Sequence, residues 1–276
     1  MKIFKIFIAL LFAFIISCNN IEDPLKPIDN TTCGDENGTL PIRKILVEDY
    51  TAHKCVFCPL AANTLEEIKD KYCDHIIPIG IHVGYLAEPD DEFQNDFRTN
   101  TGNELDNYYN ISASLPKGLI NRTKYDGNIL LSSNNWASFV NTLYSVKPEI
   151  DITVESMYDE ETKKVTTTIS AEYLANINSN MNVGLYVTED SIISPQKLVG
   201  SPTIEDYVHR HMLRKSITSA FGDNFVSSAN FGDIIEKEYT FSVENEWNIN
   251  HLELVAFISN TETKEIIQAE SEPLEK

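Results

Sequence analysis

Basic residues are scarce in this sequence. Its 276 residues include 22 Lys and Arg against 42 Asp and Glu, for a formal net charge of −20. A protein that binds nucleic acid or an anionic membrane surface through charge needs a basic face. The shortage of basic residues therefore argues against a nucleic-acid partner. The acidic residues are spread along the chain, which is typical of a solvated surface.

The apolar run at residues 6–16 is too short to span a bilayer and has the length of a signal peptide, preceded by Lys2 and Lys5. The segment Ile15-Ile16-Ser17-Cys18 that follows resembles a bacterial lipobox. It predicts a signal peptide over residues 1–17, cleavage before Cys18, and acylation of Cys18 by chains such as palmitate. The membrane is then a partner through lipidated Cys18. The alternative is an ordinary signal peptide with a chance cysteine.

Several sequence patterns that indicate common enzyme sites are missing. The sequence signals no Ser-His-Asp arrangement, no glycine loop that would hold a phosphate, and no paired-carboxylate motif. We therefore expect no cofactor. Residues 18–39 contain Pro24, Pro27, Gly34 and Gly38 and are predicted to be a tether between the membrane and the first domain.

Cysteines are few, and four of the five remain when Cys18 is set aside. A location in the cell envelope permits disulfides. An even number suits the pairs Cys55–Cys58 and Cys33–Cys73, although four cysteines allow three pairings and the sequence does not choose between them. The Cys33–Cys73 pair would be a structural disulfide, and a buried free thiol at Cys73 is the alternative.

The sequence places Cys55-x-x-Cys58 between a buried strand at residues 42–51 and a helix that begins near Pro59. A Cys-x-x-Cys motif between a strand and a helix is the thioredoxin arrangement. The positive end of the helix dipole favours a thiolate at this point, and His53 and Lys54 are expected to help. Cys55 is predicted to be the attacking sulfur.

The rest of residues 40–147 fits a thioredoxin-like α/β domain. A strand at residues 76–84 follows the helix, and one or two short helices are expected within residues 88–110. Pro116 lies where a cis-proline would stand beside the two cysteines, and a trans-proline that starts a loop is the alternative. Residues 134–146 have the apolar spacing of a closing helix.

The hydrophobic period changes to that of strands after residue 148. Roughly seven short strands separated by polar turns predict an all-β immunoglobulin-like sandwich over residues 148–276. This half also contains a dense basic cluster, His209, Arg210, His211 and Arg214. The cluster is either a contact to the first domain or to a ligand, or a polar loop that leads into a strand.

Three interpretations of Cys55 and Cys58 remain open: a redox-active dithiol, a static structural disulfide, and a metal site completed by His53, Cys73 or His75. A single Cys-x-x-Cys is weak evidence for zinc, which takes four ligands, so no metal is expected.

Three segments resemble the outer-membrane-protein-28-related lipoproteins of Gram-negative bacteria: residues 44–59, residues 115–122 and residues 207–214. The resemblance implies an outer-membrane location, a lipid anchor, and a thioredoxin-like domain followed by an immunoglobulin-like domain. Lys54 stands where catalytic thioredoxins commonly have tryptophan. The expected function is thiol–disulfide exchange through Cys55 and Cys58, with Pro116 presenting backbone to an envelope or surface protein. The alternative is a non-enzymatic surface protein that binds or adheres through the same scaffold.

Overall fold

The computed structural model describes residues 41–274, and its N-terminal half begins with a parallel β-α-β unit. Strand β1 (Ile45–Thr51) leads into helix α1 (Cys58–Tyr72) and then strand β2 (Ile76–His82). The two strands pair in parallel along their full length. The strand–helix–strand order agrees with the one predicted from the sequence.

The other helices are α2 (Asn100–Tyr109) and α3 (Trp136–Tyr144). The other strands are β3 (Lys117–Ile120), β4 (Ile150–Asp159), β5 (Lys164–Tyr173), β6 (Met181–Glu189), β7 (Ile192–Gln196), β8 (Ile204–His209), β9 (Met212–Ser216), β10 (Asp223–Val226), β11 (Ile234–Ser242), β12 (Leu252–Asn260) and β13 (Ile266–Pro273). The fold is thus mixed α/β and consists mostly of sheet. Within the described residues, no helix has the length and apolar character needed to cross a membrane.

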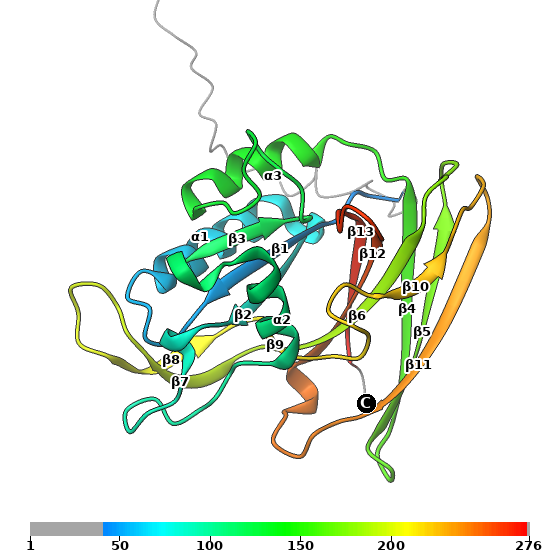
Figure 1. Cartoon of the computed structure of the whole chain (residues 1–276). Coiled ribbons are helices and arrows are strands. Elements are labelled where there is room, and N and C mark those ends of the chain that lie inside the picture. Colours follow the sequence, from blue (N-terminus) through cyan, green and yellow to red (C-terminus); the bar gives the residue numbers. More distant parts are fainter. Residues whose placement is uncertain (1–40, 275–276) are drawn as a thin grey trace, which may run out of the picture.

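One large sheet connects the two halves of the chain, in the order β13-β12-β6-β9-β2-β1-β3, with β10 paired to β6. The connection between the halves is the short parallel contact of β2 with β9, where the Gly80 amide donates to the His211 carbonyl at 2.8 Å. Hydrogen bonding in the sheet therefore continues past the expected domain boundary at residue 148 (Figure 1).

Separate hydrophobic cores lie on the faces of this sheet. A second sheet, β11-β5-β4, packs on the β6 and β12 side, and apolar residues that alternate along these strands fill the space between the two layers. At the other end, α1 and α3 cover one face of β1 around Ile45, Val47 and Trp136. Strand alternation sends Leu46, Glu48 and Tyr50 to the opposite face of β1.

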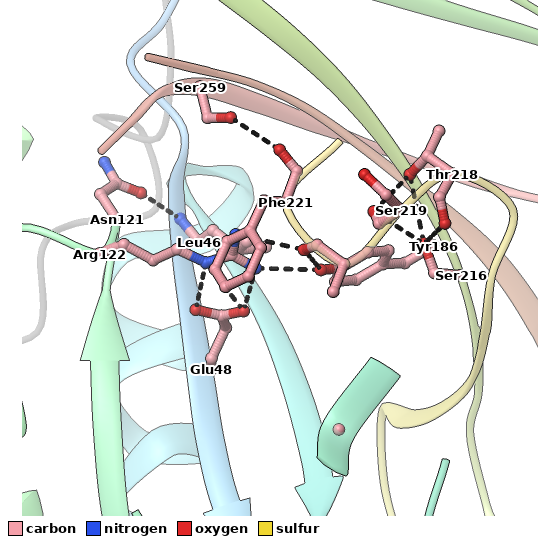
Figure 2. Close-up of polar contacts among 12 residues, drawn as sticks. Leu46, Glu48, Asn121, Arg122, Tyr186, Ser216, Thr218, Ser219, Phe221 and Ser259 are labelled. Carbon is pink, nitrogen blue, oxygen red and sulfur yellow. Dashed lines mark hydrogen bonds and ion pairs between the residues drawn. The ribbon is translucent and has the colours of Figure 1, made fainter. Parts of the chain in front are cut away.

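A buried ion pair lies on that opposite face, where the two halves meet (Figure 2). Arg122 donates to the Glu48 carboxylate from Nη2 at 2.7 Å and from Nε at 3.0 Å, and both side chains are almost fully buried. Arg122 Nη2 also donates to the Tyr186 hydroxyl of β6 at 3.0 Å, and that hydroxyl donates to the Ala220 carbonyl. The ion pair therefore joins β1 to strands of the C-terminal half.

The turn after β3 directs Arg122 into this position. Asn121 and Arg122 both have left-handed backbone conformations, with φ of 47° and 50°. The Asn121 side chain accepts from the Leu46 amide at 2.8 Å, and the Asn121 carbonyl accepts from the Ile266 amide at 2.8 Å. Asn121 thus continues the pairing with β1 and also contacts the start of β13.

We predict that Arg122→Leu and Glu48→Leu each lower the free energy of unfolding by about 3–5 kcal/mol, because each leaves a buried charge without its partner. The double variant should lose less than the sum of the two single variants, because no unpaired charge remains. Urea unfolding of the four proteins measures this. As a control, Lys215→Leu breaks an exposed ion pair with Glu244 and should cost no more than about 1 kcal/mol. Additive single losses would contradict the prediction.

Candidate functional site

Cys55 and Cys58 form a disulfide in the turn between β1 and α1. The Cys55 amide donates to the Ala52 carbonyl at 3.0 Å, and the Cys58 amide to the Cys55 carbonyl at 3.3 Å, so the turn is tight. Pro59 stands in the first turn of α1, where backbone amides have no hydrogen-bond acceptor within the helix, so the amide hydrogen that proline lacks is not missed. Both cysteines are buried, with 4% and 1% of their surfaces exposed.

Pro116 precedes β3, and the Leu115–Pro116 peptide bond is cis. The Leu115 side chain packs against a small buried cluster that contains Ala52, Cys55, Cys58 and Ala87. The structure thus brings Cys55 and Cys58 together with Leu115, the residue before Pro116.

The two residues before Cys55 do not supply the free positive charge that the sequence suggested. Lys54 forms an ion pair with Asp90, with Nζ and Oδ2 3.2 Å apart. His53 is buried and stacks on Phe93. Burial lowers the pKa of His53, so this imidazole is neutral at pH 7. The start of α1 remains as a source of positive potential at the cysteines.

His53 belongs to a group of three buried histidines that adjoin the motif. The ring centre of His82, in β2, lies 6.1 Å from that of His53 and 5.4 Å from that of His209, in β8. Phe97 packs against all three rings. Burial lowers the pKa of His209 to about 4 and that of His82 well below its usual value. The group is therefore uncharged at neutral pH.

Asp49 is a buried carboxylic acid that sequence reasoning did not single out. It follows Val47 by two residues in β1 and so faces α1, whose first residue is Cys58. Its side chain is buried, and its Oδ1 has no hydrogen-bond partner. Burial raises the pKa of Asp49 to about 7. A carboxyl with this pKa exchanges protons readily near neutral pH.

A cavity of about 190 Å³ adjoins Asp49. Its lining comes from both halves of the chain: Asp49, Ala62, Asn63, Leu65, Glu66, Gly80, Tyr207, Val208, Arg210 and His211. His211 Nε2 lies 3.3 Å from the Glu66 carboxylate, and a hydrogen bond from His211 lowers the pKa of Glu66.

The basic cluster of the C-terminal half is not one site in the structure. His209 is buried among the aromatic rings near the cysteines, whereas His211 contacts Glu66 of α1. Arg210 pairs with Asp190 at 3.6 Å, and Arg214 pairs with Glu189 at 3.4 Å. The two histidines thus contact the N-terminal half, while the two arginines pair with carboxylates of their own half.

Cys73 is disulfide-bonded and follows the C-terminal end of α1. Its expected partner Cys33 lies outside the described residues, as do Cys18, the signal peptide and the tether at residues 1–39. The 15-residue helix α1 separates Cys73 from Cys58 by roughly 22 Å. His75 accompanies Cys73 and bonds the Arg43 carbonyl, so neither residue joins the motif. Residues 41–274 contain no group of three or more candidate ligands that could hold a metal.

A segment of the C-terminal half contacts the Cys-x-x-Cys turn, and this contact was not predicted from the sequence. Strands β7 and β8 form a hairpin that was not predicted, and the polypeptide between them reaches the Cys-x-x-Cys turn (Figure 1). The Lys197 amide donates to the His53 carbonyl at 2.8 Å, and the Val199 amide to the Val56 carbonyl at 2.9 Å. The Ile192-Ile193 and Tyr207-Val208 pairs were the available signals for these strands.

The fold and the site define a class: a mixed α/β protein, mostly of sheet, with a buried Cys-x-x-Cys disulfide at a helix start. The chain belongs to the family of outer membrane protein Omp28, whose model matches residues 102–276, more than half of the chain. The match begins after Cys58, so membership assigns no role to the two cysteines.

Two solved structures with TM-scores above 0.5 support the fold. HBP35 of Porphyromonas gingivalis is 15% identical, with 85% of this chain and 76% of that chain covered and a TM-score of 0.66. A protein from Agrobacterium tumefaciens is 11% identical, with 85% and 96% covered and a TM-score of 0.53. A domain of the outer membrane lipoprotein Omp28 from P. gingivalis is 22% identical, with 45% and 93% covered and a TM-score of 0.32. A search of curated proteins found no similar sequence.

We predict that Asp49→Asn raises stability at pH 8 more than at pH 4. The raised pKa means that the folded protein holds a proton that the unfolded chain releases above about pH 4, so the wild type loses stability as pH rises from about 4 to about 7. The difference in unfolding free energy between variant and wild type should grow by about 3 kcal/mol over this range. Urea unfolding at several pH values measures it, with exposed Asp91→Asn as the control. A difference independent of pH would contradict the prediction.

Proposed function

We propose that this protein is a thiol–disulfide exchange protein of the outer membrane, anchored through lipidated Cys18. In this proposal residues 40–147 are a thioredoxin-like domain and residues 148–276 an immunoglobulin-like sandwich. The observation that carries it is the Cys55–Cys58 disulfide at the start of α1, packed against Leu115 of the cis-proline turn. Family membership supports the outer-membrane location.

The reaction is a two-step exchange with a client protein. In the reducing direction, the Cys55 thiolate attacks one sulfur of a client disulfide and the other client sulfur leaves as a thiolate. The Cys58 thiolate then attacks Cys55 in the mixed disulfide, expels the second client sulfur, and forms the Cys55–Cys58 bond. Two electrons pass to the client, whose thiolates take up protons. In the oxidising direction a client dithiol runs the same steps in reverse.

Asp49 serves proton transfer in this proposal. Cys58 must lose its proton before it attacks, and it gains one when it leaves. Asp49 faces the helix that begins at Cys58 and has a pKa raised to about 7, so it suits both roles. The adjacent cavity gives this buried carboxyl a route to solvent past Glu66 and His211.

A second candidate function is binding without redox chemistry, and one observation favours it. Cys55 and Cys58 are almost fully buried, as a static structural disulfide would be. In that case the scaffold would bind or adhere to an envelope or surface partner, and the disulfide would only hold the turn in shape.

We predict that Cys55→Ser abolishes disulfide exchange with insulin, because it removes the attacking sulfur. Cys58→Ala should instead accumulate mixed disulfides, since the resolving thiol is absent. Non-reducing gels and turbidity of reduced insulin report the two outcomes. Cys73→Ser is the matched control: it removes a disulfide-bonded cysteine at the far end of α1 and should retain exchange. Exchange by Cys55→Ser at the wild-type rate would exclude the proposed mechanism.

We also predict a reduction potential of about −120 to −270 mV for the Cys55–Cys58 pair, the range of working thiol–disulfide proteins. Equilibration of the mature chain in thiol buffers, followed by trapping of free thiols, measures it. A value below about −300 mV would mark a structural disulfide and favour the binding function.

A further inference from the structure

The segment at residues 196–199 lies directly across the Cys-x-x-Cys turn, and we call it the strap. Its first residue, Gln196, is 2% exposed. The Gln196 side-chain amide donates to the Cys55 carbonyl at 3.1 Å and to the Ala52 carbonyl at 3.3 Å. The strap therefore bonds the very turn that presents the disulfide.

The disulfide is closed to reaction in this conformation, and the strap bonds the turn that carries it. Exchange requires an attacking thiolate to reach a sulfur of the disulfide, so its rate depends on access. Cys55, which would be attacked, is only 4% exposed. Ala87 and Leu115 pack against the cysteines, so a client or reductant can reach Cys55 only when the turn is released from its surroundings, and the strap is one of the segments that hold it.

The backbone of the strap binds as an extended peptide would. The amides of Lys197 and Val199, two residues apart, donate to the carbonyls of His53 and Val56. Donors on alternate residues are also what an extended peptide offers, although the two acceptors here are three residues apart in a turn and form no β-ladder. Val199 and Phe57 are 41% and 54% exposed, so apolar side chains border this contact.

The remaining contacts of the strap are weaker than those of the hairpin that carries it. Lys197 forms an ion pair with Glu92 at 3.7 Å, and both side chains are exposed. The base of the hairpin is instead held by buried His209 against Phe97 and His82. Residues 197–199 lie beyond the last pair of the hairpin, Gln196 with Ile204, so this part of the strap can move while the hairpin stays.

We propose that the strap is a built-in blocking strand, and that the client is an extended polypeptide segment carrying a cysteine that takes over the carbonyls of His53 and Val56. This inference rests on the proposed exchange function: the strap closes the Cys55–Cys58 site, and a client peptide opens it by replacing the strap. When the strap leaves, a client thiolate attacks Sγ of Cys55, the Cys55–Cys58 bond breaks, and Cys58 departs as a thiolate. A second client thiolate then attacks the client sulfur and releases Cys55, so that the client dithiol is oxidised and the protein disulfide reduced.

The test compares the rate at which a water-soluble phosphine reduces the Cys55–Cys58 disulfide in the full mature chain and in Gln196→Ala. The variant loses buried hydrogen bonds that hold the strap, and we expect reduction to be faster by about tenfold or more. The control is Ile193→Ala, which shortens a 64% exposed side chain in the same hairpin and should react like wild type. Equal rates in Gln196→Ala and wild type would overturn the proposal.

A second variant guards against misfolding of the first. Val199→Pro removes only the backbone donor to Val56 and should also speed reduction. A synthetic peptide with the sequence of residues 195–200, added to Gln196→Ala, should slow reduction again by occupying the vacated carbonyls. Failure of the peptide to slow reduction at millimolar concentration would overturn the assignment of an extended client.

The same variants separate this proposal from the exchange function. Fast phosphine reduction of Gln196→Ala without insulin exchange would support the strap as a cover and reject catalysis. Insulin exchange at equal rates in wild type and Gln196→Ala would support catalysis and reject the strap as a barrier.

Discussion

The ion pair of Glu48 and Arg122 fixes how the two halves of this protein meet. Removing two charges from water is costly, and the cost is offset only if the partners stay in contact with their remaining donors satisfied. Here Tyr186 supplies the additional partner from β6, and Asn121 holds the turn that aims Arg122 (Figure 2). A shift of β1 relative to β6 would break these bonds together, so the register of the large sheet between the halves is held closely.

The position of the hairpin over the cysteines follows from that register. Strand β9 pairs with both β6 and β2, and the hairpin β7–β8 immediately precedes it in the chain. Strand β9 begins at Met212, opposite Gly80 near the C-terminal end of β2, and β2 lies beside β1. The hairpin that comes just before β9 therefore lies near the C-terminal end of β1, from which the chain continues to Cys55. The C-terminal half therefore does more than adjoin the N-terminal half, because Gln196 bonds the turn that carries Cys55 and His211 lines the cavity beside Asp49.

Sequence periodicity predicted the local elements well, because a strand such as Ile45–Thr51 or a helix such as Cys58–Tyr72 carries its own apolar pattern. It also directed attention to Pro116 through its place before an apolar strand. It missed Asp49, since a single carboxylate in a strand gives no signal until the sheet buries it. It missed the strap at residues 196–199 because a contact made by backbone amides leaves no pattern in side chains. The sequence analysis expected His53 to help keep Cys55 as a thiolate, but His53 is buried and its pKa is lowered. This burial could not be read from the sequence, because Phe93 and Phe97, which pack on His53, are distant from it along the chain.

Burial gives the site two opposing dependences on pH. The pKa of Asp49 is raised, so its contribution to stability is present below about pH 4 and lost as pH rises to about 7. Burial lowers the pKa values of His82 and His209, so their contribution is present above about pH 6.5 and lost as pH falls, for His209 toward about 4. Asp49 faces α1 beside the cavity, whereas His209 packs at the base of the hairpin. Falling pH therefore protonates Asp49, which stabilises the fold around it, while it adds charge to the buried histidines at the base of the hairpin β7–β8. Acid is expected to weaken the packing of the hairpin, which carries the strap, before it weakens β1.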